Sequence, residues 1–236
     1  MPGDFMSGEL LQTIVLANWK AQLSPQRAAQ WCETLLASYH PRQGVEVVLA
    51  VPFLFLQAVA RQVNNVPGVS LAAQMVSPFP QGSYTGTVPA AWLRGLVTYV
   101  LVGHQERRRY FRETPQDVAR QALECLTEEL QPIVCVDRDT VAAQAAAFDY
   151  AQQDRLMWAY TPQDAVSLER SHGYATIAET IRSIKVRVGG QPVLYGGGVD
   201  STNCRELTRL QSVAGVMMGR GCLDAEAFLR ALESLG

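Results

Sequence analysis

The sequence has no long apolar run and little concentrated charge of either sign. No apolar stretch approaches the roughly 18 residues of a membrane-spanning helix. The formal net charge is −2, and the densest basic segment is ERRRYFR, which contains Arg107 to Arg109. Nucleic acids and anionic membranes attract strongly basic surfaces. We therefore expect no nucleic acid and no membrane as partner, and we interpret the arginine run as structural.

The five cysteines are scattered, without a C-x-x-C pair or a histidine at ligand spacing. They are Cys32, Cys125, Cys135, Cys204 and Cys222. This spacing predicts neither a disulfide framework nor a zinc site, and we expect no metal and no other cofactor. The segment MPGDFMSGELLQ lacks a basic region followed by an apolar one, so a secretion signal is not expected. Reduced thiols and the missing signal together predict a cytoplasmic protein.

Eight short apolar segments rich in β-branched residues recur along the chain. Most are apolar at consecutive positions, which is the pattern of strands covered on both faces in a parallel sheet. With 48% hydrophobic residues, one large core is expected. We predict strands at residues 13–19, 45–52, 69–74, 99–104, 131–136, 155–160, 192–197 and 215–220.

Segments with helical spacing lie between the predicted strands. Ser24, Thr114 and Asp224 are expected as N-caps, the first two with a proline at the first helical position. Eight alternations of strand and helix in 236 residues favour a closed (β/α)₈ barrel over an open doubly wound sheet. We expect residues 1–12 to be an N-terminal extension and residues 13–236 to form a single barrel domain.

Glycine-rich turns follow the last two predicted strands, as GGGVD at 196–200 and GRGCLD at 219–224. In a (β/α)₈ barrel the active site lies at the carboxyl ends of the strands, and phosphate is often held after strands seven and eight. Backbone N–H groups in such turns surround an anion, and a helix N-terminus adds a favourable dipole. The sequence therefore predicts a phosphate site that contains Gly197, Gly198, Gly219 and Arg220.

A lysine and a histidine stand at the ends of two other predicted strands. Lys20 follows the first strand, and His104 ends the fourth. A cationic donor and a neutral imidazole donor at one opening are the pair that polarises a carbonyl and stabilises an enediolate. We therefore predict that Lys20 and His104 act together on a carbonyl substrate.

Motifs along the whole chain resemble those of the triosephosphate isomerase family. They are ANWK (17–20), AAQMV (72–76), GSYTGTV (82–88), LVGHQERRRYF (101–111), PIVCV (132–136), LYGGGV (194–199) and GVMMGRGCLDAEAFLRAL (215–232). The resemblance implies a TIM barrel, a small phosphorylated sugar as substrate and an isomerase reaction. It also implies a homodimer in which loop 77–89 lies in the interface and Thr85 reaches the neighbouring active site.

The resemblance also implies roles for four residues that match the family's motifs. In that family the asparagine and lysine of N-W-K contact the substrate, which here are Asn18 and Lys20. The histidine of G-H-S-E is a neutral electrophile that works with a glutamate base. His104 matches this histidine, and Glu106 matches the glutamate of the same motif.

The catalytic glutamate of the family's A-Y-E-P motif is replaced by Thr161. A hydroxyl without a partner of its own is no general base near neutral pH. A rival alignment makes the polar residues 149–154 the strand and puts Arg155 at the base position, so it loses the glutamate as well. An active enzyme would need Asp164, Glu169 or Glu106 as its base.

Other departures from the family's pattern fall at the same end of the barrel. The family's lid sequence is replaced by QDAVSLERSHG at 163–173, and single changes occur at Gln105, Asp137, Arg138, Gly198 and Arg220. They are compatible with drift after loss of the parent activity. They are also compatible with a site reshaped for another ligand, in which Arg138 or Arg220 makes bidentate contacts to an anion.

Two functions therefore remain open, and whether the protein is an enzyme remains open with them. The first is an aldose/ketose isomerase of small phosphorylated sugars, in which ordinary triosephosphate isomerase activity is weak or lost because Thr161 replaces the base. The second is a catalytically inactive homodimeric paralogue with a binding or structural role.

Overall fold

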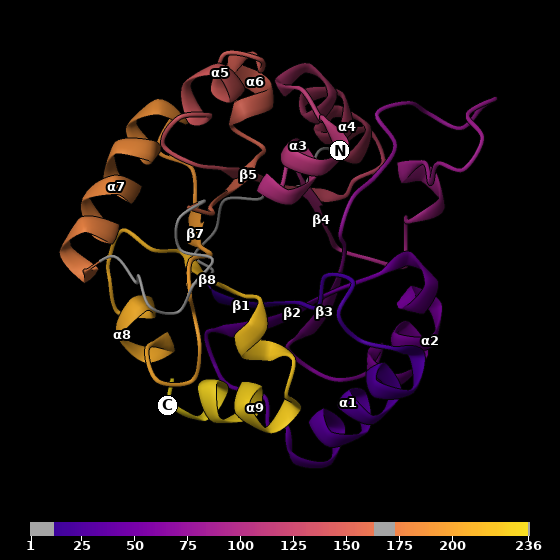
Figure 1. Cartoon of the computed structure of the whole chain (residues 1–236), viewed down its shortest axis with the longest axis vertical. Helices are drawn as coiled ribbons and strands as arrows, with labels where there is room; N and C mark the ends of the chain where they lie inside the picture. Colours follow the sequence, from indigo (N-terminus) through magenta and orange to yellow (C-terminus); the bar gives the residue numbers. More distant parts are fainter. Residues whose placement is uncertain (1–11, 163–172, 236) are drawn as a thin grey trace, which may run out of the picture.

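The computed structural model describes residues 12–162 and 173–235 and places them around a closed barrel of parallel strands (Figure 1). Each strand pairs with the next along the chain, and β8 pairs with β1, which closes the barrel. The predicted single-domain (β/α)₈ barrel is thereby confirmed. The strands are β1 (Thr13–Asn18), β2 (Val45–Val51), β3 (Val69–Ala73), β4 (Tyr99–Val102), β5 (Gln131–Val136), β6 (Met157–Tyr160), β7 (Val193–Tyr195) and β8 (Gly215–Met218).

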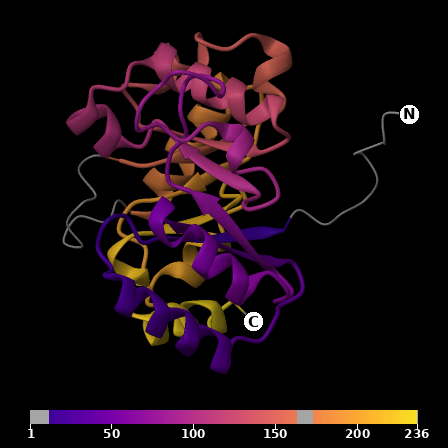
Figure 2. The same ribbon diagram turned by 90° about the vertical axis from the view of Figure 1, so that its right-hand side faces the viewer.

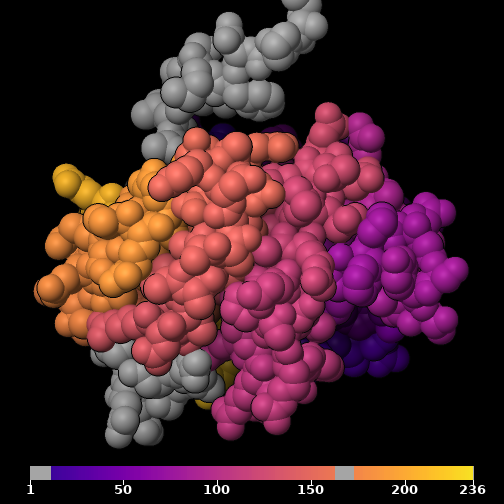
Figure 3. Space-filling view, turned by 90° about the horizontal axis from the view of Figure 1, so that it is seen from above, coloured from indigo at the N-terminus to yellow at the C-terminus, as the bar shows by residue number. Residues whose placement is uncertain are grey.

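Helices and short 3₁₀ turns surround the strands (Figures 1 and 2). On one side of the molecule the segments that include α4, α5, α6 and α7 form a continuous surface, coloured magenta to orange in Figure 3. The helical elements are α1 (Pro25–Ser38), α2 (Phe53–Val63), η1 (Ala90–Trp92), α3 (Gln105–Phe111), α4 (Pro115–Thr127), α5 (Val141–Ala145), α6 (Tyr150–Gln153), α7 (Tyr174–Arg187), α8 (Cys204–Thr208), η4 (Arg220–Cys222) and α9 (Ala225–Glu233).

The three predicted N-caps are confirmed by their hydrogen bonds. The Ser24 side chain accepts from the N–H of Arg27 at α1, and the Asp224 side chain accepts from the N–H of Ala227 at α9. Thr114 opens α4 with a full capping box, in which the Asp117 side chain also accepts from the Thr114 N–H. Such caps satisfy N–H groups that have no partner inside the helix, which fixes where each helix starts.

The rival alignment around strand six is wrong. Residues 150–153 form the short helix α6, which the Asp149 side chain caps, and the strand is Met157–Tyr160. This strand pairs with both β5 and β7, and the N–H of Thr161 continues the ladder to Val136 O at 2.8 Å. Arg155 precedes the strand and therefore lies at the opposite end of the barrel from the predicted site.

Two layers of apolar side chains bury the strands on both faces, as their consecutive apolar residues predict. One cluster fills the inside of the barrel and includes Leu16, Val48 and Leu101. The other lies between the barrel and the helices and includes Val15 and Val47, the neighbours in sequence of the first two. Alternate residues of a strand point to opposite faces, so neighbouring residues supply the two layers.

The amino-terminal end of the barrel contains a half-buried polar group. Glu46 on β2 accepts hydrogen bonds from the Ser70 hydroxyl at 2.5 Å and from the Tyr99 hydroxyl at 2.7 Å. Burial raises the pKa of Tyr99, and the hydrogen bond to Glu46 adds to this effect. The three side chains link β2, β3 and β4 below the apolar interior.

Within the described part of the chain, no helix combines the length and the apolar character needed to cross a bilayer.

Candidate active site

A cavity of 250 Å³ opens at the carboxyl ends of the strands and gathers residues that are far apart in the sequence. All of the predicted site residues except Thr161 and Gly197 line it. The lining consists of Asn18, Lys20, Gln22, His104, Gln105, Glu106, Pro162, Gly196, Gly198, Val199, Met217, Gly219, Arg220 and Gly221.

A larger cavity of 460 Å³ lies beside α2, near the amino ends of β3 and β4. Among the described residues that line it, Arg61 is the single charged side chain, and none is a histidine or a carboxylate. The smaller cavity combines a lysine, a histidine and a carboxylate at one opening. We place the candidate active site there, because chemistry needs convergent polar groups more than volume.

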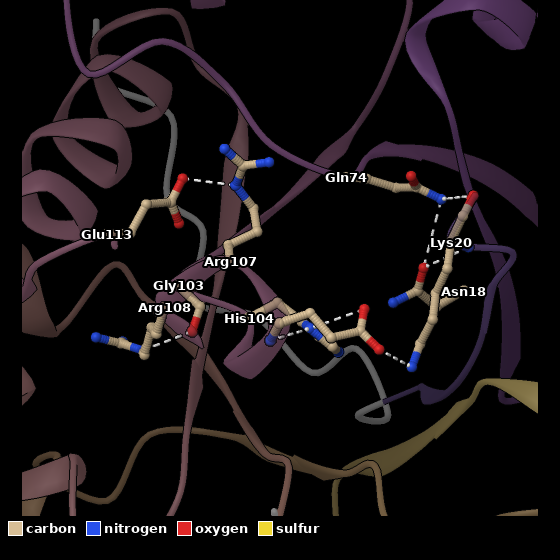
Figure 4. Close-up of polar contacts among 9 residues, drawn as sticks. Asn18, Lys20, Gln74, Gly103, His104, Arg107, Arg108 and Glu113 are labelled. Carbon is tan, nitrogen blue, oxygen red and sulfur yellow. Dashed lines mark hydrogen bonds and ion pairs between the residues drawn. The ribbon is translucent and has the colours of Figure 1, made fainter. Parts of the chain in front are cut away.

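Lys20 enters the cavity from the turn that follows β1. Its backbone has a φ of 51°, in the left-handed region that non-glycine residues rarely adopt. Its N–H donates to Asn18 Oδ1 at 3.1 Å, and its ammonium lies 2.6 Å from Glu106 Oε1 (Figure 4). The cation is therefore held across the opening, between the ends of β1 and β4.

His104 is the N-cap of α3, and its imidazole is buried with 9% of the side-chain surface exposed. Nδ1 accepts the backbone N–H of Glu106 at 3.2 Å, so Nδ1 carries no proton and Nε2 remains as the donor. Burial lowers the pKa of His104 to about 4; Glu106 opposes this shift, while Lys20 and Arg107 add to it. The imidazole is therefore neutral at physiological pH.

The close contact between the side chains of His104 and Glu106 does not form an ion pair. Glu106 Oε2 lies 3.6 Å from His104 Nδ1. A protonated imidazole would attract the carboxylate at this distance. Nδ1 of His104 accepts a hydrogen bond, and the pKa of His104 is low, so the imidazole is uncharged. The ion-pair partner of Glu106 is therefore Lys20.

Gly103 and Arg108 hold the end of β4 that carries His104. Gly103 has a φ of +67°, and a Cβ placed on it would lie 2.5 Å from the Arg108 guanidinium. Arg108 Nε donates to Gly103 O at 2.7 Å, and Nη2 donates to Cys135 O and to Gln144. Arg107 pairs with Glu113 at 2.5 Å. The structural interpretation of the arginine run is confirmed for Arg107 and Arg108.

Thr161 follows β6 but turns away from the cavity. It is 1% exposed, and its hydroxyl lies 3.5 Å from Val136 O, at the limit of a hydrogen bond. The next residue, Pro162, lines the cavity instead. Of the other base candidates, Glu106 contacts Lys20, whereas Asp164 and Glu169 lie outside the described residues.

The glycine turns after β7 and β8 form the remaining wall of the cavity. Gly198, Gly219 and Arg220 line it, and Gly198 has a φ of 61°. A Cβ on Gly221 would lie 2.5 Å from Val199 O, so the two turns pack backbone against backbone. A Cβ on Gly197 would lie 2.6 Å from the Tyr195 hydroxyl. Close packing against Tyr195 therefore explains why this position is a glycine.

The two arginines that could contact an anion are placed differently. Arg220 lines the cavity at the carboxyl ends of the strands. Arg138 donates to the Thr180 hydroxyl at 2.6 Å and lines a separate cavity of 430 Å³ along α7. Of the two arginines, Arg220 is therefore the one that lines the candidate active site.

The sequence analysis assigned no role to two glutamines that lie in or next to the site. Gln22 lines the cavity, and no motif pointed to it. Gln74 donates through Nε2 to Lys20 O and Ala50 O, within the AAQMV motif that carried the family resemblance. Within the described ranges 12–162 and 173–235, no group of three or more histidine, cysteine, aspartate or glutamate side chains is placed to hold a metal ion.

Comparisons with known proteins agree with this geometry. The family profile described as triosephosphate isomerase matches residues 13–235. The triosephosphate isomerase of Deinococcus radiodurans is 31% identical over 247 residues, which cover 95% of this chain and 100% of that protein. The one from Thermus thermophilus is 32% identical over 254 residues, which cover 95% and 99%. This similarity supports an isomerase-like function, and the chain belongs to the triosephosphate isomerase family.

Proposed function

We propose that the cavity at the carboxyl ends of the strands binds a small phosphorylated sugar, and that ordinary triosephosphate isomerase turnover is weak or lost. The expected loss of turnover follows from the placement of Thr161. A buried hydroxyl that faces a backbone carbonyl cannot remove a proton from carbon.

Carbonyl polarisation is the part of isomerase chemistry that the site supports. The neutral His104 has a donor at Nε2, and the Lys20 ammonium lies at the same opening. Both act on the oxygen at which negative charge develops, and neither needs to change its protonation state to do so. Asn18 fixes the backbone of Lys20 beside them.

Anion binding is supported by the opposite wall of the cavity. Gly198, Gly219 and Arg220 line the same cavity as Lys20 and His104. Backbone N–H groups in glycine turns and an arginine are the usual donors to a phosphate group. The ligand class that fits both walls is a small carbonyl compound with a phosphate group.

A catalytically inactive homodimeric paralogue is the alternative function. The pairing of Glu106 with Lys20 favours it, because a carboxylate held by an ammonium at 2.6 Å is a poor substitute base. In this reading the barrel and the anion site remain, and the protein has a binding or structural role.

We also propose a homodimer, supported by apolar side chains exposed on neighbouring segments. Monomeric proteins rarely expose so many large apolar residues in one region. The rings of Phe79 and Tyr84 stack at 4.6 Å within loop 77–89. The segments that follow β2, β3 and β4 expose Leu54, Phe79, Tyr84, Trp92, Tyr110 and Phe111.

Light scattering tests the homodimer. Wild type should have the mass of two chains, and the double variant Trp92→Asp, Tyr110→Asp should have the mass of one. Val186→Asp is the matched control, because Val186 is 84% exposed on α7, away from loop 77–89. A wild-type protein that is monomeric at micromolar concentration would refute the dimer.

A cytoplasmic location is part of the proposal. All five cysteines are buried as free thiols, and burial raises the pKa of Cys32, Cys135, Cys204 and Cys222 to about 12. Thiols of this kind are compatible with a reducing compartment.

A coupled assay on glyceraldehyde 3-phosphate tests the activity. We expect wild-type kcat/KM far below the range of about 10⁴ to 10⁸ M⁻¹s⁻¹ that is typical of enzymes. His104→Ala should reduce any residual rate further. A wild-type rate inside that range would show that another residue supplies the base.

A thermal-shift titration with inorganic phosphate tests the proposed binding of a phosphate group in the cavity. Ligand that binds the folded state raises the Tm. Arg220→Ala should reduce this rise, whereas Arg138→Ala, which changes a separate cavity, should leave it intact. No shift in wild type at tens of millimolar phosphate would contradict anion binding.

A further inference from the structure

The indole of Trp31 joins α1 to the turn that follows β8. Trp31 is buried, and its Nε1–H donates to Cys222 O at 2.8 Å. The two residues are 191 positions apart in the sequence. Cys222 ends η4, which also contains Arg220 and Gly221, two residues of the cavity wall. A buried tryptophan of a helix is therefore bonded directly to the turn that forms part of the proposed anion site.

The same indole packs against the residue that precedes Lys20. The rings of Trp31 and Trp19 meet edge to face, with their centroids 4.9 Å apart and their planes at 66°. This arrangement of two aromatic rings is favourable beyond the area that it buries. Phe228 of α9 lies against Trp31 as well, with the ring centroids 5.5 Å apart. Trp31 thus contacts both the turn after β1 and the turn after β8.

These two turns meet at the cavity. A Cβ placed on Gly219 would lie 3.6 Å from Lys20 Cε and 3.8 Å from Lys20 Nζ, so the lysine side chain lies against the glycine. The ladder between β1 and β8 ends at the pair of Ala17 and Met218. Lys20 and Gly219 lie beyond this pair, and their relative position therefore depends on contacts outside the sheet.

The contacts within the turn after β8 are local. The Cys222 N–H donates to Gly219 O at 3.1 Å, and Cys222 Sγ lies 3.0 Å from the same oxygen. These bonds set the shape of the turn and leave its position in the molecule open. Gly221 places the turn against the turn after β7, through its close packing on Val199 O. The Trp31 indole places it against α1.

We propose that Trp31 is a positioning residue for the turn at residues 219–222. Its N–H holds this turn, and its ring holds Trp19 beside Lys20, so the two walls of the cavity keep their relative position. Without the N–H, the buried C=O of Cys222 loses a donor, which is unfavourable, and the turn shifts toward another one. The consequence for ligands rests on the proposed function, whereas the consequence for the turn does not.

Indole labelling gives a direct readout of this contact. The chain contains four tryptophans, so protein labelled with indole-¹⁵N tryptophan has four Nε1–H signals. Trp158 is an internal control, because its buried Nε1 has no partner among the described residues. In a titration of wild type with inorganic phosphate, we expect the Trp31 signal to move and the Trp158 signal to stay in place.

Two matched variants separate positioning from a general loss of core packing. Trp31→Phe and Trp158→Phe both replace a buried indole by a smaller ring, and both should lower the Tm. Among the described residues, Trp31 Nε1 has an acceptor and Trp158 Nε1 has none. The dissociation constant of inorganic phosphate should rise about tenfold in Trp31→Phe and change by less than about twofold in Trp158→Phe.

Hydrogen exchange gives a readout that needs no ligand. The backbone amide of Cys222 should exchange at least about tenfold faster in Trp31→Phe than in Trp158→Phe, because the turn opens more easily. Equal exchange rates in the two variants would overturn the inference. So would a Trp31 signal that stays in place while wild type binds phosphate. If wild type binds no phosphate, the proposed function fails, and the Cys222 exchange rates alone decide the role of Trp31.

Discussion

The two ends of the barrel each contain a glutamate that is satisfied in a different way. At the amino-terminal end, Glu46 accepts hydrogen bonds from two hydroxyl groups, those of Ser70 and Tyr99. At the carboxyl-terminal end, Glu106 pairs with the ammonium of Lys20, beside a neutral histidine and a strained turn. The first end contains contacts between neighbouring strands, and the second contains a contact between the turn after β1 and the first turn of α3.

This difference separates stability from chemistry within one fold. Hydroxyl groups on the neighbouring strands donate hydrogen bonds to the Glu46 carboxylate, and no lysine or arginine is involved. These contacts therefore contribute to the stability of the fold. At the other end the Lys20 ammonium is partly exposed and the buried His104 lines the same cavity, so a ligand there can contact both. In (β/α)₈ barrels the chemistry is placed at the carboxyl ends of the strands, and the opposite face contributes stability.

The largest effect is a loss of stability in acid that arises at the carboxyl-terminal end. His104 has a pKa of about 4 in the folded protein and about 6.5 when unfolded, so the unfolded chain takes up its proton first as the pH falls. The contribution is complete above about pH 6.5 and is lost as the pH falls through about 4, with a size of about 3 kcal/mol. Chemical denaturation of wild type and His104→Asn between pH 7 and 4 measures it. Equal slopes in the two proteins would contradict the neutral buried histidine.

The next effect is a gain of turnover in Thr161→Glu. A positioned general base contributes about 10² to 10⁴ in rate. We expect about 10², at the low end, because position 161 is buried and its hydroxyl faces Val136 O. The measurement is kcat/KM on glyceraldehyde 3-phosphate. The double variant Thr161→Glu, His104→Ala should lose the gain. A folded Thr161→Glu protein without any gain would favour the inactive paralogue.

Replacing each glutamate by leucine compares the two ends directly. Glu46→Leu leaves two hydroxyl groups without an acceptor and should lower the free energy of unfolding by about 2 kcal/mol. Glu106→Leu should lower it by less than about 1 kcal/mol, since the Lys20 and Glu106 side chains are 31% and 40% exposed and water screens the pair. Urea denaturation gives both values, and phosphate affinity should change in Glu106→Leu alone. A reversed order of stabilities would refute the division between the ends.

The smallest effect is expected for Ser70→Ala at the amino-terminal end. This change removes one of two donors to Glu46 and should lower the free energy of unfolding by about 1 kcal/mol. The Tyr99 hydroxyl remains at 2.7 Å from the carboxylate. Thermal denaturation combined with the phosphate titration checks this prediction. A changed phosphate affinity would mean that the two ends are coupled.

The fold was predictable because runs of consecutive apolar residues survive in every strand. The eight predicted segments contain the eight observed strands, and the N-caps at Ser24, Thr114 and Asp224 are where the sequence predicts them. Most of the errors concern the carboxyl ends of strands, although β6 and β7 also begin later than predicted, at Met157 and Val193. Gly103 and His104 were expected in strand four but leave the sheet, since a φ of +67° at Gly103 ends the extended conformation.

The site was predictable where one side chain defines the chemistry, as for Lys20 and His104. It was not predictable where a side chain acts through the backbone of a distant segment. The contact of Gln74 with Lys20 O joins residues 54 positions apart, and apolar periodicity contains no trace of it. The direction of the Thr161 hydroxyl depends on the pairing of β6 with β5, which is likewise a property of the folded barrel.

The contact between Gly103 and Arg108 restricts the order in which this sequence can change. Any side chain at position 103 would collide with the Arg108 guanidinium, and it would also have to adopt a positive φ. Arg108 in turn joins β4 to Cys135 on β5 and to Gln144 on α5. Folding alone therefore preserves the glycine that presents His104. A lineage that abandoned catalysis would be expected to retain Gly103 and Arg108 for this reason, so their presence alone is no evidence of catalysis.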